Sequence, residues 1–472
     1  MLGLVVVLTT GLALAAFAQG PPNIRLHPRD VNNPEPWEVA AAQAAGGTVL
    51  APLPEVREFA GAIWAGDVNA AFRDCSEERW QWILRQPEFK YLHFQTTLDS
   101  LAYHLGAPEY QINRRRIAEA AQAGKLVTMQ FWMNHDGPFN CSYYSICNVG
   151  QLLPVRLRLF AALAECIEWY GPENLHATYL WEEVAGSNEC WEICVPAQDY
   201  RNNWNGIVDG SDTGQMSRER PWLIGRDKSK FDGPYMPSAR NSRDAMLAET
   251  GVDMLTADNW SPQDWQVWRR WASRGFLGET NAQWAKFLRT EYPGIRPLSW
   301  AYPAMAGDKF TDCGYERDGG CGGMMVNSYD SDGWVYTVCR AARTLYAGPQ
   351  YEVHFIAHGD RPQEDMTRQA ELAWRGGATS ISFFSGDNNA RWGECLDKAQ
   401  VAIRALLPRP VMADPYPVLV VSDDYYRPTH KFLDTLGRFD VVSSQDRYAV
   451  EEGRYQQVID LTPGPQPLWG AE

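Results

Sequence analysis

Short apolar runs alternate with helical patterns along most of the chain. Eight runs are rich in β-branched and aromatic residues, and turn residues bound each of them. They span residues 62–64, 91–94, 126–132, 177–181, 297–302, 324–329, 353–357 and 379–384. Helical patterns between them span residues 115–123, 156–170, 263–274, 280–292, 336–345 and 364–373. Strands alternating with helices form a parallel sheet, so the pattern predicts an α/β fold, a closed (β/α)8 TIM barrel.

One interval in this pattern is much longer than the others. An insert at about residues 184–295 separates the fourth and fifth predicted strands, and its first half is rich in Gly, Asn, Asp, Ser and Trp. The loops that follow barrel strands build the active site, so we expect the insert to form one wall of a cleft. The alternative is a small subdomain with no part in the site.

The two ends of the chain predict segments outside the barrel. Residues 1–15 form an apolar run, and Ala16-Phe17-Ala18 follows it as a cleavage site, so the predicted signal peptide spans residues 1–18. The run is shorter than the ~20 residues of a membrane span and predicts a signal peptide, with an uncleaved anchor as the alternative. We therefore expect a secreted or periplasmic protein with no membrane span in the mature chain. Residues 19–58 predict an N-terminal lead-in, and residues 59–408 the barrel with its insert.

Beyond the barrel, residues 409–472 predict a short C-terminal open α/β segment. Apolar runs at 417–421, 439–442 and 458–460 surround a helical pattern at about 429–436. The segment is short for an independent domain. It is therefore either incomplete or completed by packing on the barrel.

Composition narrows the classes of partner. With 43 Lys and Arg against 58 Asp and Glu, the formal net charge is −15, which disfavours nucleic-acid binding. The chain contains 20 Trp and 21 Tyr, and flat aromatic faces beside polar groups suit sugar rings. We expect a carbohydrate substrate; a Trp-rich core is the alternative. The sequence contains no Walker loop and no Gly-x-Gly-x-x-Gly motif, so we expect no cofactor. The oligomeric state stays open.

The ten cysteines predict disulfides in an oxidising compartment. Three close pairs are expected to form them: Cys141 with Cys147, Cys190 with Cys194, and Cys313 with Cys321. A zinc site at Cys190 and Cys194 is the alternative reading of one pair. No His lies at ligand spacing there, so we expect no metal site.

The end of the fourth predicted strand carries two adjacent carboxylates, in Trp181-Glu182-Glu183. Glycosidic cleavage needs one carboxyl group to protonate the leaving oxygen and a second to act as nucleophile or to activate water. Two neighbouring carboxylates repel each other, which raises the pKa of one and suits it to the acid role. Side chains alternate along a strand, so only one of the two is expected to point into the barrel mouth. An ion pair with an Arg of the insert is the alternative.

This stretch resembles the Trp-Asn-Glu that ends the fourth strand in clan A glycoside hydrolases, where the Glu is the acid/base. Glu183 matches that Glu, and Glu182 stands where the family has Asn. Residues 268–293 and 361–384 are similar to helices and the last strand of β-galactosidase-like barrels of glycoside hydrolase family 42 type, and the resemblance covers roughly residues 60–405. It implies acid-catalysed hydrolysis of glycosidic bonds in a polysaccharide or oligosaccharide.

The seventh predicted strand departs from that family. The family's nucleophile is a Glu at the end of this strand, and aligning the following Gly with Gly359 puts Ala357 at its place. The second carboxylate must then come from elsewhere, and Asp330 is preferred because it follows the sixth strand. The other candidates are Asp258, Asp332 and Asp360. An inverting enzyme accommodates the wider carboxyl separation of roughly 6.5–9.5 Å that such a partner would produce. The alternative for residues 330–333 is a turn or a fragment of a calcium loop.

Polar and aromatic residues gather at the other predicted strand ends, which converge on one mouth in a barrel. The candidate substrate-binding residues are Trp64, Asp67, Trp132, Asn134, His135, Trp300, Tyr329, His358 and Asp387. The sequence thus favours a secreted glycoside hydrolase-like protein. The alternatives are a barrel of the same ancestry that binds a glycan without cleaving it, and a cell-surface interaction protein whose aromatics serve protein contacts.

Overall fold

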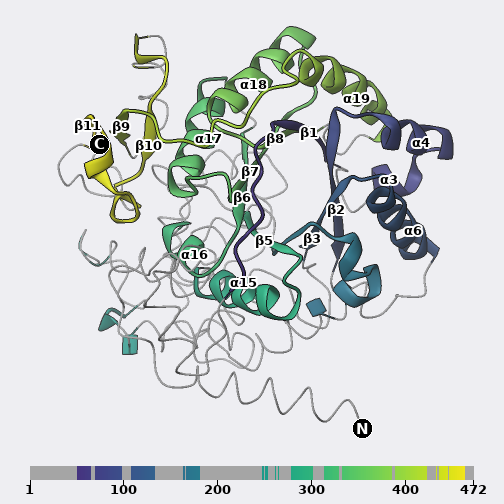
Figure 1. The fold of residues 1–472 in the computed structure, drawn as a ribbon, viewed down its shortest axis with the longest axis horizontal. Helices are drawn as coiled ribbons and strands as arrows, with labels where there is room; N and C mark the ends of the chain where they lie inside the picture. The colour runs from purple at the N-terminus through teal and green to yellow at the C-terminus, as the bar shows by residue number, and fades with distance from the viewer. Residues whose placement is uncertain are drawn as a thin grey trace.

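The computed structural model describes residues 50–64, 70–97, 108–132, 163–164, 166–180, 247–248, 250–253, 261, 264, 278–300, 313–328, 332–384, 389–422, 432, 435–444 and 446–462. Eight parallel strands in this part close into a barrel in chain order (Figure 1). They are β1 (Ala60–Trp64), β2 (Phe89–Thr97), β3 (Leu126–Trp132), β4 (Ala177–Leu180), β5 (Arg296–Trp300), β6 (Gly323–Ser328), β7 (Glu352–His358) and β8 (Ser380–Phe384). The barrel closes where Ala60 pairs with Ser380, so the predicted (β/α)8 fold is confirmed.

Helices cover the outside of the barrel (Figure 1). They are α3 (Ala70–Asp74), α4 (Glu77–Arg85), α6 (Pro108–Gln122), α15 (Glu279–Glu291), α16 (Cys313–Asp318), α17 (Asp332–Leu345), α18 (Gln363–Arg375) and α19 (Asn389–Arg404), with a short 3-10 turn η2 (Pro172–Asn174) before β4. The predicted helix at 280–292 agrees with α15 within one residue. α6 begins at Pro108, earlier than the predicted residue 115, because its first turns are mostly polar.

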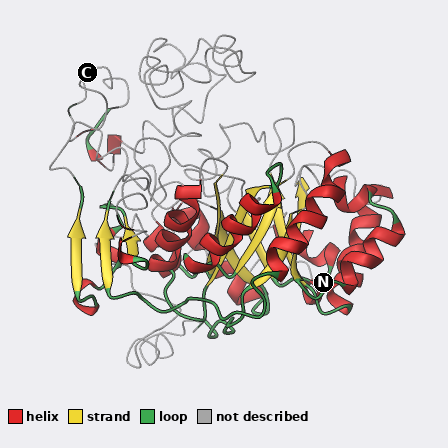
Figure 2. Cartoon of the chain, turned by 90° about the horizontal axis from the view of Figure 1, so that it is seen from above, coloured by secondary structure: helices red, strands yellow, loops and turns green. Residues whose placement is uncertain are grey.

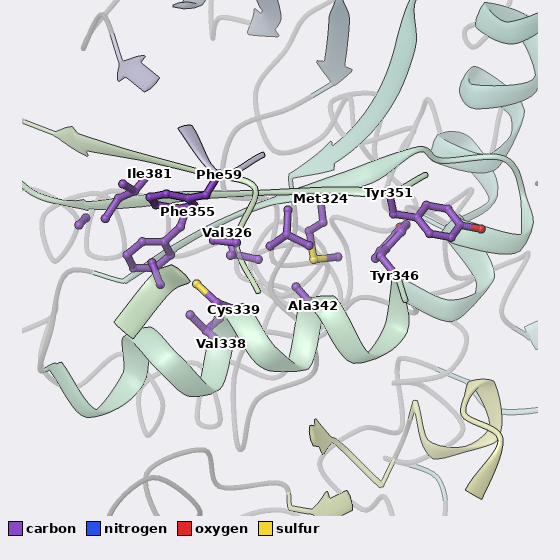
Figure 3. Packing of buried hydrophobic residues seen from close by; sticks show 14 of the residues in the cluster. Phe59, Met324, Val326, Val338, Cys339, Ala342, Tyr346, Tyr351, Phe355 and Ile381 are labelled. Carbon is purple, nitrogen blue, oxygen red and sulfur yellow. The ribbon is translucent and has the colours of Figure 1, made fainter. Parts of the chain in front are cut away.

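The main hydrophobic core lies between the strands and these helices. Strand side chains alternate, and every second one points outward into this layer. Figure 3 shows its centre, where Val338 and Ala342 of α17 lie against Met324, Val326 and Phe355 of β6 and β7. All five are fully buried. The outward faces of the strands therefore bind the helix layer to the barrel.

The C-terminal segment forms a three-stranded parallel sheet beside the barrel (Figure 2). Its strands are β9 (Val418–Val421), β10 (Asp440–Val442) and β11 (Gln457–Asp460), in the order β10-β9-β11, with 3-10 turns η6 (Arg447–Ala449) and η7 (Glu452–Arg454) before β11. Arg340 of α17 donates from Nε to Asp440, 2.7 Å away, and its guanidinium lies 3.8 Å from the ring centroid of Tyr416. Both charged groups are buried, so the C-terminal segment packs on the barrel through this ion pair.

Residues 50–59, which we call the strap, cross the amino end of the barrel. Their carbonyl groups accept hydrogen bonds from Arg289, at Ala51, and from Arg296, at Pro54. Val56 N donates to Pro349 O (2.7 Å), and Phe59 N donates to Arg409 O (3.0 Å). The strap corresponds to the last residues of the predicted lead-in.

One predicted disulfide is wrong. Cys313 begins α16 and Cys321 lies just after it; both are buried, and no disulfide joins them. Cys321 Sγ points to the carbonyl of Asn281 in α15, 4.0 Å away, so the thiol packs between the helices instead of reaching Cys313. Cys141, Cys147, Cys190 and Cys194 lie outside the described residues. Among the helices that the structure describes, none is both long and apolar enough to cross a membrane.

Candidate functional site

The inside of the barrel is unusually polar. In β7 the side chains of Glu352 and His354 point inward, whereas Val353 and Phe355 belong to the outer core. The inward positions of β2, β3 and β8 are also polar at several levels: His93, Gln95, Thr128, Gln130, Ser380 and Ser382. Barrel interiors are usually filled by Val, Ile and Leu. This interior therefore carries groups whose chemistry needs an explanation.

Glu352 organises the amino end of the interior. It begins β7, is fully buried, and its two carboxylate oxygens receive different partners. Oε1 lies 2.9 Å from His176 Nε2 and accepts from Tyr91 OH at 3.3 Å. Oε2 lies 2.9 Å from His354 Nε2 and 3.6 Å from Arg296 Nε. We call these five residues the Glu352 cluster. It joins strands β2, β5 and β7 with the residue that precedes β4.

The electrostatics of the cluster favour a charged Glu352. Burial raises the pKa of a carboxyl group, but the charges of His176 and Arg296 and two histidine hydrogen bonds outweigh it and hold the pKa of Glu352 well below its usual range. Burial together with the Glu352 charge raises the pKa of Tyr91 well above its usual value. Burial also lowers the pKa of His354 in spite of its bond to Glu352. Glu352 is therefore a buried carboxylate held by Arg296 and by the hydrogen-bonding groups of His176, His354 and Tyr91.

Ser380, His354 and Glu352 are bonded in the order of a hydrolase triad. Ser380 Oγ lies 2.7 Å from His354 Nδ1, and His354 Nε2 faces Glu352. Nucleophile, base and orienting carboxylate are the parts that nucleophilic catalysis needs. All three side chains are fully buried in the amino half of the barrel, where no substrate carbonyl can approach. This series of three hydrogen-bonded side chains therefore stabilises the barrel and is not a catalytic triad, because the active sites of this fold lie at the opposite end.

Toward the carboxyl end the interior becomes aromatic. Trp64 packs edge-on against Trp300, with ring centroids 5.2 Å apart and an interplanar angle of 87°. Tyr179 packs on the other side of Trp300, at 5.4 Å and 77°. Phe384 packs against the same group. We call Trp64, Tyr179 and Trp300 the aromatic layer. Trp64 and Trp300 are the last residues of β1 and β5, and Tyr179 lies in register with the polar residues Gln130 and Gln95, so the layer lies among polar residues near the carboxyl end of the interior.

The structure describes four of the predicted site residues. Trp64 and Trp300 lie in the aromatic layer, and both are nearly fully buried. His358 ends β7 and is half-buried, and Trp132 ends β3, although its side chain is not described. The other predicted site residues lie outside the described residues: Glu182, Glu183, Asp330, Asp67, Asn134, His135, Tyr329 and Asp387.

The side chain of Ala357 faces the helices. It belongs to the outer core together with Phe355, whereas Ile356 belongs to the inner group of the aromatic layer. Alternation then gives the last inward position of β7 to His358. The alignment that puts Ala357 at the nucleophile position therefore compares a helix-facing residue with a mouth-facing one. Asp360, one of the alternative carboxylates, is exposed just past β7.

The Glu352 cluster was missed by sequence reasoning. Its members were assigned to strands or strand ends only. A signal was present: residues 352–358 read Glu-Val-His-Phe-Ile-Ala-His, with a polar side chain at three of the four alternate positions. A fully buried parallel strand ordinarily reads as a continuous apolar run. Polar residues at period two in such a strand indicate a polar barrel interior.

A shallow pocket of about 600 Å³ lies outside the barrel, between α18 and the C-terminal segment. Its lining includes Trp374 and Arg375 of α18 and Tyr416, Leu436 and Arg438 of the C-terminal segment. Arg375 donates to Gly437 O (2.8 Å) across it. The pocket is remote from the strand ends, so it is not the candidate active site.

No protein-family model and no curated protein matches the chain. Solved structures with a similar fold include a β-1,4-mannanase from the sea hare Aplysia kurodai, at 10% identity over 76% of this chain and 94% of that chain, with a TM-score of 0.38. The catalytic domain of β-amylase from Paenibacillus polymyxa is similar at 12% identity over 74% of this chain and 98% of that one, with a TM-score of 0.45.

A third structure carries a different chemistry. D-psicose 3-epimerase from Clostridium cellulolyticum H10 is similar at 12% identity over 71% of this chain and 95% of that chain, with a TM-score of 0.31. Hydrolases and an epimerase thus share this likeness. One barrel hosts many reactions, so the reaction of this chain must be argued from its own residues.

Proposed function

We propose that the protein is a glycoside hydrolase-like enzyme that cleaves glycosidic bonds in a polysaccharide or oligosaccharide, with Glu183 as the general acid. One observation carries the proposal. β4 belongs to a closed parallel barrel and ends at Leu180, three residues before Glu183 in the sequence. The loops that follow barrel strands carry the catalytic residues of this fold. The resemblance of residues 268–293 and 361–384 to family 42 barrels supports the same assignment.

The alternation of β4 distinguishes the two carboxylates. Ala177 and Tyr179 belong to the inner group of the barrel. Extending that alternation beyond Leu180 assigns the inward side to Glu183 and the outward side to Glu182. The negative charge of Glu182 next to it is proposed to keep the proton of Glu183 available for the leaving oxygen, because neighbouring carboxylates repel each other.

The second carboxylate is proposed to be Asp330, with an inverting mechanism. It follows the last residue of β6, Ser328, by two positions. In β6 the inward side belongs to Met325 and Asn327, so alternation gives the next inward position to Tyr329. Asp330 would therefore act from the loop, farther from Glu183 than a strand-end carboxylate, and an inverting enzyme needs that room for a water molecule.

The aromatic residues are proposed to form the base of a sugar-binding cleft. Trp64 and Trp300 lie in the layer directly below the strand ends, and His358 is the half-buried polar residue beside it. Aromatic faces with a few hydrogen-bonding groups are typical of small-molecule sites. The proposed cleft also includes Trp132, Asp67, Asn134, His135, Tyr329 and Asp387, with the insert at about 184–295 as one wall.

The proposed compartment is secreted or periplasmic, after removal of residues 1–18 as a signal peptide. The apolar run and the Ala16-Phe17-Ala18 site support it. Mass spectrometry of the protein exported by a native-type host should find an N-terminus near Gln19. A product that retains Met1 would contradict the proposal.

Glu183→Gln tests the catalytic assignment. General acid catalysis typically contributes ~10²- to 10⁴-fold, so turnover of a natural glycan should fall by about that factor while binding persists. An activated aryl glycoside should lose much less, because its leaving group needs little protonation. Glu182→Gln is the matched control, and its turnover should stay well above that of Glu183→Gln. Full activity of Glu183→Gln on a natural glycan would refute the role of Glu183.

A second candidate is a barrel that binds glycans without cleaving them. The specific observation is that β7 presents His358, and no carboxylate, at its last inward position. Incubating the wild-type protein with a panel of oligosaccharides separates the candidates. Binding by calorimetry without release of reducing ends would favour the binding protein, and release of reducing ends would exclude it.

A further inference from the structure

His93 is a buried histidine at the centre of the barrel that the proposed function does not use. It lies on β2, in register with Trp64 of β1 on one side and Thr128 of β3 on the other. Its ring centroid is 5.3 Å from that of His354 and 6.1 Å from that of Trp64. His93 therefore lies between the Glu352 cluster and the aromatic layer, and only 1% of it is exposed.

Neither ring nitrogen of His93 has a hydrogen-bond partner in the described part of the chain. The hydroxyl of Thr128, its register neighbour on the same inward face, also has none among the described residues. Trp300, whose ring packs against Trp64, likewise has no hydrogen-bond partner for its Nε1 within that part. Buried polar groups left unbonded are destabilising, and almost all of those in folded proteins are satisfied by protein or by ordered water.

The chemistry of the two neighbours is complementary to a small polar molecule. Burial and the nearby His354 lower the pKa of His93 well below its usual value, so the ring is neutral and offers one donor and one acceptor. The Thr128 hydroxyl offers the same pair. The next inward residue in register beyond Thr128 is Ala177, and β1 contributes Ala60 and Ala62. The inward side chains at these three positions are therefore small.

We propose that His93 and Thr128 bind internal water inside the barrel. The water donates to one of these side chains and accepts from the other, which fixes the tautomer of His93. The inference does not depend on the proposed glycosidase activity, because it concerns buried groups of the barrel interior.

A crystal structure at high resolution tests the site directly. Ordered water is expected within about 2.7–3.2 Å of a His93 ring nitrogen and of Thr128 Oγ1. Density that places only carbon atoms around both groups, or another protein side chain bonded to His93, would overturn the inference. Either result is independent of activity, so it does not depend on the role of Glu183.

Thr128→Val provides a second test that needs no crystals. Valine has the shape of threonine and folds into the same space. If water bridges Thr128 and His93, the loss of the hydroxyl leaves a histidine nitrogen unsatisfied, and the melting temperature should fall by about 2 °C or more. If the interior is dry, removing an unsatisfied hydroxyl leaves the melting temperature unchanged or raises it, and the inference is wrong.

Thr178→Val is the matched control. Thr178 is a fully buried threonine on β4 that faces away from the inner group, and its hydroxyl also has no partner among the described residues. Its replacement should not lower the melting temperature, because no histidine depends on it. The difference between the two valine variants therefore reports the water at His93 and not the general cost of changing a buried threonine.

Discussion

The two ends of the barrel interior solve the same packing problem with different chemistry. The amino end holds a buried carboxylate whose oxygens are shared by His176, His354, Tyr91 and Arg296. The carboxyl end holds aromatic rings that meet edge to face. A buried charge is tolerated only where its partners are held in place, and the strap holds one of them, Arg296, through the carbonyl of Pro54. The polar groups at the amino end are thus bonded to one another, whereas the aromatic rings at the carboxyl end lie where the βα loops begin.

The largest effect on stability is expected from Glu352→Gln. The change leaves Arg296 buried without its counter-charge, and breaking a buried ion pair typically costs about 3–5 kcal/mol. The free energy of unfolding from urea titration at pH 7 should fall by that amount. Glu364→Gln, an exposed glutamate in the first turn of α18, is the control and should change it by less than about 0.5 kcal/mol. Equal small losses in both variants would mean that the amino end is not held by its charge.

A smaller effect is expected from Trp300→Phe in the aromatic layer. Phenylalanine retains an aromatic ring but alters the contacts with Trp64 and Tyr179, so a loss of about 1 kcal/mol is expected. Glycan affinity should fall as well, because the layer is proposed to lie under the substrate. Trp284→Phe is the matched control: this buried tryptophan stacks on Phe287 in the outer core, at 5.7 Å. A similar stability loss with unchanged affinity is expected there. Unchanged glycan affinity in both variants would show that the aromatic layer is not part of the substrate-binding site.

The pH dependence of stability should show two stages. The folded pKa of His93 is lowered, so the unfolded state binds protons that the folded state does not, and stability is lost as the pH falls below ~6.5. The folded pKa of Glu352 is also lowered, so its contribution is present above ~4.3 and is lost as the pH falls further. Melting temperatures measured from pH 8 to about pH 2 should show both stages.

Variants assign each stage of that profile. His93→Phe should weaken the stage below ~6.5, at most about 1.4 kcal/mol for each pH unit, and leave the later one. His358→Gln, at the other end of β7, should leave the first stage in place because His93 remains. A first stage that persists undiminished in His93→Phe would contradict the buried, neutral state of this histidine.

The smallest effect is expected for the cysteines of the helix layer, which lie outside the barrel interior. No disulfide is formed by the six cysteines that the structure describes, which are Cys75, Cys166, Cys313, Cys321, Cys339 and Cys395. Titration of the denatured, unreduced protein with a thiol reagent should therefore count at least six. A count below six would show that Cys313 and Cys321, or another of these residues, form a disulfide after all.

The sequence predicts the outside of the barrel better than the inside. β3 was predicted to the residue, because Val127, Met129 and Phe131 supply an uninterrupted outward apolar face. β2 was predicted too short, because Gln95, Thr96 and Thr97 are polar although the strand continues to pair with β3 through Thr97. Outward side chains pack against helices that follow nearby in the chain. Their apolar pattern can therefore be recognised in a short stretch of sequence.

The inside depends on residues far apart in the chain. Tyr91 and Glu352 are separated by 261 positions, and His176 and Glu352 by 176. No local sequence pattern predicts that such residues will contact the carboxylate of Glu352. Only the closure of eight strands into a barrel brings them together. The same reasoning explains why Ala357 was assigned to the mouth. Whether Ala357 faces inward or outward depends on which of its neighbours face the barrel axis. In the sequence, only the alternation of the polar residues Glu352, His354 and His358 indicates this.

The strap has a consequence for biosynthesis. Phe59 donates its amide hydrogen to the carbonyl of Arg409, and Ala60 donates to Thr379. These contacts require residues that a ribosome adds roughly 20–70 s later, at about 5–20 residues per second. Until then the first strand has no eighth strand to pair with, and the barrel cannot close. A nascent chain of this protein should therefore rely on chaperones for most of its synthesis, and truncation before Arg409 should yield insoluble protein.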